Sequence, residues 1–341
     1  MNKKTVITLA SVFSVFLILA FLMGKVYKIG QDRPPLKYAT IPESTQRFIK
    51  GLIRMGGHMA GVDIVEGGGP YDWENGKDVG QREGENWSRE EDEFFIVYYK
   101  KDKEAVWQGH AQNILQAANE NILPLTRLMG KYYYPADQNG RKLPIYLATS
   151  PQEYSETASK LLESPYRGQG SIGVTISQLG GAGCKASIVI HPICFQCNPR
   201  AHNGYVTVLL HEMNHYVFMS SLDLSQDVAF CNWQVEGLAD YCANTYVGNI
   251  ETSMPEARIQ YIDKYCSLLK DFPSETIAEY WAGESYFRYM EDAHGDTFVK
   301  DFIQATFKNT TEKTFSAMKL DPNNEHKGWV KSLREINSQK E

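Results

Sequence analysis

Residues 208–216 read VLLHEMNHY, which places two histidines and a glutamate inside an apolar run. On an α-helix, residues four positions apart share one face, so His211 and His215 can direct both imidazoles at one point. Glu212 lies beside that point. Imidazole nitrogens are common zinc ligands, and a neighbouring carboxylate can take the proton of a water held there. The HExxH pattern therefore predicts a helix that carries part of a zinc site.

A second stretch offers the rest of such a site. Residues 233–241 read WQVEGLADY, and their distance from His215 suits a second helix folded back against the first. Glu236 can then be the third ligand and leave the fourth position to water, as a catalytic zinc requires. Asp240, one turn further along, can accept the second N–H of His211 or His215 and so fix that ligand's tautomer.

A simpler interpretation stays open for both stretches. A motif as short as HExxH also arises by chance, and His211 and His215 would then be ordinary histidines on a half-buried helix. Glu236 and Asp240 would likewise belong to a solvated helix face. That interpretation gives no reason for a Glu and an Asp, four positions apart, to follow an HExxH.

The residues after the motif separate the subtypes of zinc enzyme. A three-histidine site needs Gly and His at the third and sixth positions after the second histidine, and this chain has Phe218 and Ser221 there. An HExxH followed after about twenty residues by EGLAD instead resembles the gluzincin peptidases, the thermolysin-like clan, and most of all the peptidase MA-like proteins. The resemblance implies that zinc is bound by His211, His215 and Glu236. It also implies that Glu212 is the general base and that Asp240 supports a ligand.

The same resemblance implies an α+β, zincin-like metallopeptidase domain. Such a domain has a small mixed sheet, an edge strand beside the HExxH helix and a helical C-terminal half. One zinc ion per chain would activate a water that hydrolyses a peptide bond of a peptide or protein substrate. The edge strand, expected at residues 186–190, would bind substrate backbone. Gluzincin aminopeptidases carry Gly-x-Met-Glu-Asn near this point, and residues 181–184 contain no Glu, which favours an endopeptidase.

Two tyrosines beyond the third ligand are candidates for stabilising the oxyanion. Residues 280–289 read YWAGESYFRY and are expected to be helical, with Gly295 as a helix stop. Peptidase MA-like proteins have a similar segment here, so Tyr280 is the first candidate and Tyr286 the second. Each is explained equally well as an aromatic core residue. Further helices are expected at residues 297–308, with Asp296 as the cap, and at residues 314–318 and 328–336.

The first 30 residues have the pattern of a membrane segment. Lys3 and Lys4 begin the chain with positive charge, and residues 5–24 carry no charge over a length that spans a bilayer as a helix. No small-residue cleavage site precedes Lys25, which favours a retained anchor over a cleaved secretory signal. Residues 1–30 are therefore expected to be a single-pass transmembrane helix, with the remainder extracytoplasmic. Cleavage of this segment would instead make the protein secreted.

Net charge bears on the partners of the chain, and the positions of proline and glycine indicate where its domains begin. A net charge of −6 and a pI near 5.8 offer no basic surface to nucleic acid. Residues 31–90 are expected to be a partly ordered tether, because Pro34, Pro35 and the Gly-rich residues 67–70 oppose regular elements. Residues 91–341 are long enough for the catalytic domain.

Local patterns predict the elements that precede the motif. Residues 94–99, 141–149 and 186–190 are expected to be strands, because they are rich in aromatic and β-branched side chains. Residues 103–130 have helical spacing, and Pro124 should kink or divide that helix near Asn121. Ser150 and Pro151 predict the start of another helix. The glycine-rich residues 168–183 are expected to be a loop.

Six cysteines allow more than one interpretation. An even number in an exported domain suggests disulfide bonds, and a bridge from Cys231 or Cys242 could hold the Glu236 helix in place. Cys194 and Cys197 form a CxxC, which can also be a redox pair or half of a structural zinc site, although no second CxxC exists in the sequence. The full set comprises Cys184, Cys194, Cys197, Cys231, Cys242 and Cys266.

Two functions therefore stay open beside an anchored zinc metallopeptidase. One is a catalytically inactive peptidase-fold protein that acts in binding or as a scaffold. Its usual mark is a broken HExxH or a missing third ligand, and the sequence shows neither. The other is a thiol or structural-zinc protein in which Cys194 and Cys197 are the working residues.

Overall fold

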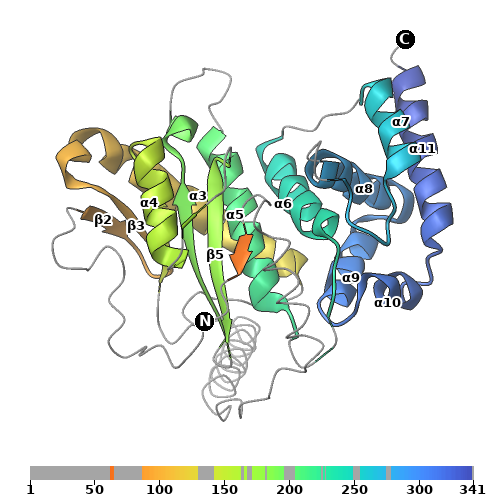
Figure 1. Ribbon diagram of the computed structural model, residues 1–341, viewed down its shortest axis with the longest axis horizontal. Helices are drawn as coiled ribbons and strands as arrows, with labels where there is room; N and C mark the ends of the chain where they lie inside the picture. The colour runs from red at the N-terminus through yellow and green to blue at the C-terminus, as the bar shows by residue number, and fades with distance from the viewer. Residues whose placement is uncertain are drawn as a thin grey trace, which may run out of the picture. The chain divides into compact units, whose positions relative to one another are not determined.

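The computed structural model describes residues 62–64, 87–129, 142–162, 165–166, 171–180, 183–195, 204–223, 226, 228–248, 254–273 and 278–339. All of them belong to the second of two compact units, Ile41–Glu341. This unit combines a mixed sheet with a helical C-terminal half, which confirms the expected α+β class (Figure 1).

The expected membrane anchor, residues 1–30, lies outside the described residues, as does most of the expected tether. Within the part of the chain that the structure describes, no helix has the length and apolar character needed to cross a bilayer. Strands β1 (Val62–Ile64) and β2 (Trp87–Glu91) come from the range expected to be a partly ordered tether, and both join the sheet.

The sheet has the strand order β1-β5-β6-β4-β3-β2. Its other strands are β3 (Phe95–Lys100), β4 (Leu143–Leu147), β5 (Gly173–Gly180) and β6 (Gly183–Ile190). Strands β3, β4 and β6 run parallel, whereas β2 is antiparallel to β3 and β5 is antiparallel to β6. Strand β1 pairs in parallel with β5. The expected strands at β3, β4 and β6 are confirmed.

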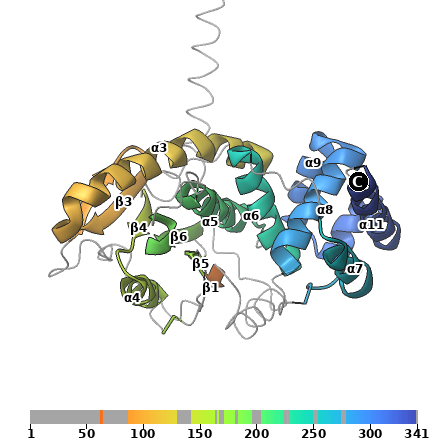
Figure 2. The same ribbon diagram turned by 90° about the horizontal axis from the view of Figure 1, so that it is seen from above.

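Helices cover both faces of the sheet (Figure 2). Alternate residues of β3, Phe95 and Val97, enter a core shared with α3 (Glu104–Leu128) and α5 (Gly204–Ser221). Ile96 and Tyr98 point the other way, into a smaller core with α4 (Pro151–Leu162). As expected, Ser150 caps α4, since its Oγ accepts a hydrogen bond from the Glu153 N–H at 3.1 Å, and Pro151 is the first helical residue.

Two predictions about the segment before α5 are wrong, one on the glycine-rich residues and one on the strand that follows them. Residues 173–180 form β5, not a loop, because Val174 and Ile176 bury their β-branched side chains between glycines. The second error concerns the edge strand. The expected edge strand at residues 186–190 is β6, which lies between β5 and β4 in the sheet. Strand β5 is the one that turns back antiparallel and lies outside β6, towards the sheet edge.

Of the two outcomes expected at Pro124, a kink or a division, the division is wrong, since α3 continues through it as one helix of 25 residues. The residues of one face, including Ile114, Ala118 and Ile122, are buried in the main core. That burial outweighs the single hydrogen bond that proline removes from the helix. Asn121 satisfies its own side chain by donating to the Ala117 carbonyl oxygen at 2.6 Å.

The C-terminal half is helical, as expected. After α5 come α6 (Asn232–Val247), α7 (Glu256–Tyr265), α8 (Ala278–His294), α9 (Asp296–Thr306), α10 (Thr311–Ala317) and α11 (Pro322–Ser338). Gly295 ends α8 with a φ of 91° and is also the N-cap of α9, the place that the sequence assigned to Asp296.

Helices α6 and α8 cross with their backbones in contact. A Cβ on Gly237 would lie 2.4 Å from the Cα and carbonyl carbon of Gly283. A Cβ on Gly283 would lie 2.6 Å from the Trp233 carbonyl oxygen. Only hydrogen fits at either position, so these two glycines set the separation of the helices.

We therefore predict that Gly237→Ala lowers the free energy of unfolding by about 1–3 kcal/mol, because the added methyl must push α8 away. The matched control is Gly109→Ala in α3, where a Cβ meets nothing within 4 Å. Alanine is the better helix former there, so this control should leave stability unchanged or raise it by up to about 1 kcal/mol. Urea unfolding of both variants measures the difference. Equal stabilities would show that the crossing tolerates a methyl group.

Candidate metal centre

Three predicted ligands from two helices converge in the structure. Helix α5 supplies His211 and His215, and α6 supplies Glu236. The two histidine Nε2 atoms are 2.9 Å apart, and each is 3.3 Å from Glu236 Oε2. Among the described residues, this is the group of histidine, cysteine and acidic side chains whose donor atoms lie close enough to share one metal ion.

Two of the three separations, those from Glu236 Oε2 to the histidine nitrogens, match tetrahedral zinc, and the 2.9 Å between the two nitrogens is shorter. With zinc bonds of about 2.0–2.1 Å, neighbouring ligand atoms of a tetrahedron lie about 3.3 Å apart. Glu236 Oε2 is buried and has no well-aligned hydrogen bond within the described part of the chain. A buried carboxylate oxygen without a donor, facing two imidazole nitrogens, is in the environment that a bound cation would satisfy.

Asp240 contacts the first histidine. Its Oδ1 accepts a hydrogen bond from His211 Nδ1 at 2.8 Å. This contact leaves Nε2 of His211 as the nitrogen that faces His215 and Glu236. The sequence offered either histidine as the partner of Asp240, and the structure places it on His211. Such a bond fixes the ring's orientation and raises its basicity as a ligand.

The charges of the cluster favour an ionised Glu236. Burial alone would raise its pKa, but the neighbouring His215 and His211 lower that pKa to about 2. Burial opposes protonation of His211, yet Asp240 and Glu236 raise the pKa of His211 well above its ordinary value. The carboxylates around these imidazoles therefore stabilise a positive charge in the centre of the cluster.

Glu212 lies on the β5 side of the same helix turn. It is 3% exposed, and burial raises the pKa of its carboxyl. Its Oε2 accepts a hydrogen bond from Thr175 Oγ1 at 2.7 Å. A Cβ on Gly173 would lie 2.7 Å from Glu212 Oε1. Thr175 and Gly173 were not among the residues predicted for this site. The signal available for them was a glycine within a strand, which marks a close approach of another group.

The two candidate tyrosines lie in different places. The Tyr280 ring stacks on His211 with ring centroids 5.8 Å apart, and its buried hydroxyl has no hydrogen-bond partner among the described residues. The Tyr286 ring packs instead against Trp233 and Trp329 in the core. Tyr286 is fully buried. The structure therefore brings Tyr280 to the candidate centre and leaves Tyr286 as an aromatic core residue.

The described cysteines are not bonded to one another. Cys194, Cys231, Cys242 and Cys266 are free, so the expected bridge from Cys231 or Cys242 to hold the Glu236 helix is absent. The side chains of Cys184 and Cys197 lie outside the described part of the chain. Burial raises the pKa of the Cys194 thiol to about 12, which makes it a weak nucleophile at neutral pH.

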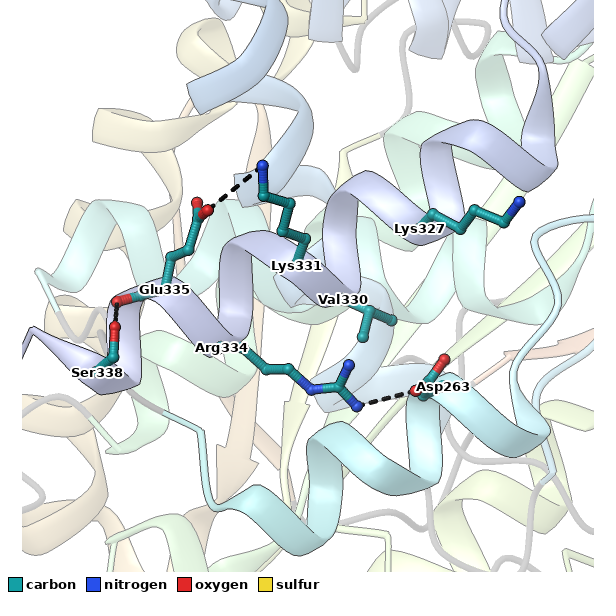
Figure 3. A pocket seen from close by; sticks show the side chains of 7 residues that line it. All are labelled: Asp263, Lys327, Val330, Lys331, Arg334, Glu335 and Ser338. Atoms are coloured by element: carbon teal, nitrogen blue, oxygen red, sulfur yellow. Dashed lines mark hydrogen bonds and ion pairs between the residues drawn. The ribbon is translucent and has the colours of Figure 1, made fainter.

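A shallow hollow of about 450 Å³ lies between α7 and α11 (Figure 3). Ion pairs cross or line it, including Arg334 with Asp263 at 2.9 Å and Lys331 with Glu335 at 3.5 Å. None of its lining residues belongs to the metal centre, so this hollow is separate from the proposed chemistry. The residues that line it are Asp263, Lys327, Val330, Lys331, Arg334, Glu335 and Ser338.

No protein-family model matches this chain, and its sequence shows no significant match to a curated protein.

We predict that Asp240→Ala weakens zinc binding about 10–100-fold, because His211 loses the partner that orients it. His215→Ala should abolish stoichiometric zinc, since it removes a ligand. Competition with a chromophoric chelator measures the affinity. The matched control is Asp263→Ala, which should keep the original zinc affinity. It removes an exposed carboxylate that pairs with Arg334 outside the metal centre. Unchanged zinc affinity in Asp240→Ala would contradict the assignment.

Proposed function

We propose that this chain is a zinc metallopeptidase with a zincin-like domain, anchored to a membrane by its N-terminal segment. One observation carries the proposal. His211, His215 and Glu236 bring three ligand atoms to within 3.3 Å of one another, and the Glu212 of the same HExxH motif adjoins them. Three protein ligands leave one position of a tetrahedral zinc for water or substrate, which is the arrangement of a catalytic site.

The residues around the centre suit hydrolysis of a peptide bond. Bound zinc would supply Lewis acidity, which polarises a carbonyl group and makes a water acidic. Glu212 is the group that takes the proton from the attacking water and later gives it to the leaving amine. Tyr280 has a buried hydroxyl beside His211 that can donate to the developing oxyanion. Asp240 holds His211 in orientation.

The substrate in this proposal is a peptide or protein cut at an internal bond. Support for internal cleavage is the lack of an amine-binding Glu in residues 181–184, where aminopeptidases of the resembled clan carry one. The uncharged residues 5–24 support membrane attachment, with the catalytic domain extracytoplasmic. The net negative charge supports a partner other than nucleic acid.

The two alternative functions have less support. An inactive scaffold needs no complete ligand set, yet all three ligands, the general base and the Asp240 contact are present together. A thiol function needs a reactive cysteine, and burial raises the pKa of Cys194 to about 12. Metal analysis separates the three. One zinc per chain that is lost in His215→Ala and kept in Cys194→Ser supports the peptidase. Zinc lost only in Cys194→Ser supports a structural zinc. No zinc in any of these proteins, purified without chelators, supports the scaffold.

We predict that Glu212→Gln keeps one zinc per chain and loses nearly all turnover, by about 10²–10⁴-fold, because the amide cannot take up a proton. The measurement combines elemental mass spectrometry with cleavage of quenched fluorescent peptides. Retained zinc shows that the centre is intact. A fully active Glu212→Gln protein would exclude Glu212 as the base.

We further predict that Tyr280→Phe lowers kcat about 10²–10³-fold, since a donor to the oxyanion is lost. Tyr286→Phe is the matched control, because it removes the hydroxyl of a core ring that has no hydrogen-bond partner among the described residues. Its kcat should stay within about twofold of the original. The reverse result, with Tyr286→Phe impaired and Tyr280→Phe active, would exchange the two roles.

A further inference from the structure

One face of β5, the strand next to the HExxH helix, has an unusual composition. Successive residues of β5 point to opposite faces of the sheet. Val174 and Ile176 enter the apolar core with α4. Gly173, Thr175 and Ser177 occupy the opposite face, towards α5, where small and polar residues replace the apolar ones expected under a buried helix.

We propose that Thr175 is a positioning residue that holds the Glu212 carboxyl group in place, with Gly173 providing the space for it. The catalytic consequence rests on the proposed function. The positioning itself rests on contacts in the structure. Thr175 is fully buried, and its Oγ1 lies 2.7 Å from Glu212 Oε2 and 2.8 Å from the Glu212 carbonyl oxygen.

The hydroxyl of Thr175 matches both forms that a general base must adopt. A hydroxyl has one hydrogen to donate and lone pairs that can accept. It can donate to the ionised Glu212 carboxylate. After Glu212 has taken up a proton, the same oxygen can accept from the carboxyl group and donate to the Glu212 carbonyl oxygen instead. One side-chain conformation of Glu212 is thus held on both sides of the proton transfer.

Gly173 leaves the space that the other oxygen of the Glu212 carboxyl group occupies. A Cβ there would lie 2.7 Å from Glu212 Oε1 and 2.6 Å from Val208 Cγ1. Any larger residue would therefore displace Glu212 or the helix that carries it. Thr175 and Gly173 lie two positions apart on one strand, so β5 bonds one oxygen of the Glu212 carboxyl group and leaves space for the other.

The test compares Thr175→Val, which keeps the shape and removes the hydroxyl, with Thr175→Ser, which keeps the hydroxyl. The full chain is loaded with zinc and assayed on the quenched fluorescent peptide that it cleaves fastest in a random-sequence set. We expect kcat to fall about 10–100-fold in Thr175→Val with KM within about twofold, and to stay within about threefold of the original in Thr175→Ser. Thr175→Ala gives the same comparison if the valine variant does not fold.

Two further measurements separate positioning from general packing. Ser177→Ala removes a buried hydroxyl from the same face of β5, one that has no hydrogen-bond partner among the described residues, and it should leave kcat unchanged. Crystal structures of the zinc-loaded variants should show the Glu212 carboxyl group rotated in Thr175→Val and in its original place in Thr175→Ser.

The following results would overturn the proposal. Thr175→Val could keep the original kcat, or Thr175→Ser could be impaired as strongly as Thr175→Val. An unmoved Glu212 in the Thr175→Val structure would also overturn it. If the zinc-loaded original chain cleaves no peptide, the proposed function fails. In that case the two crystal structures still decide whether Thr175 positions Glu212.

Discussion

The backbone contact between α6 and α8 constrains the geometry of the candidate metal centre. Consecutive residues of a helix point about 100° apart, so Glu236 can face α5 while Gly237 faces α8. Because Gly237 and Gly283 have no side chains, α8 comes close enough for Tyr280 to stack on His211. The candidate third ligand and the candidate oxyanion donor thus both depend on one helix crossing, which gives a reason for the glycine that directly follows Glu236.

Charge makes the same cluster a site for a cation. Glu212 and Glu236 are both buried, and Asp240 adjoins His211. Two protonated imidazoles would still leave one of these three carboxylates uncompensated, and protonated imidazoles that face each other at 2.9 Å would repel. A divalent cation between the nitrogens and Glu236 Oε2 removes the repulsion and satisfies the carboxylates together. The buried acidic groups that would destabilise an apolar core are therefore consistent with a metal centre.

Sequence reasoning worked where spacing along one helix decides the geometry. His211 and His215 share a face by their spacing, and the EGLAD stretch placed Glu236 and Asp240 on a second helix. The helical period could also have separated the tyrosines, since six positions turn a side chain by about 240° and Tyr286 cannot share the face of Tyr280. Thr175 could not be predicted, because nothing local ties it to Glu212, which lies in another element across the sheet. Cysteine pairing likewise depends on distances that the sequence does not contain.

The position of β6 inside the sheet restricts where an extended peptide can bind. Strand addition needs a free row of backbone groups, and β6 has none because β5 and β4 flank it. The strand beside α5 that lies further out is β5, and β1 pairs with its residues from Thr175 to Ser177. One edge of a strand can pair with only one partner at a time. A peptide that paired with residues 175–177 of β5 would therefore have to take the place of β1, so such pairing and the pairing of Val62–Ile64 exclude each other.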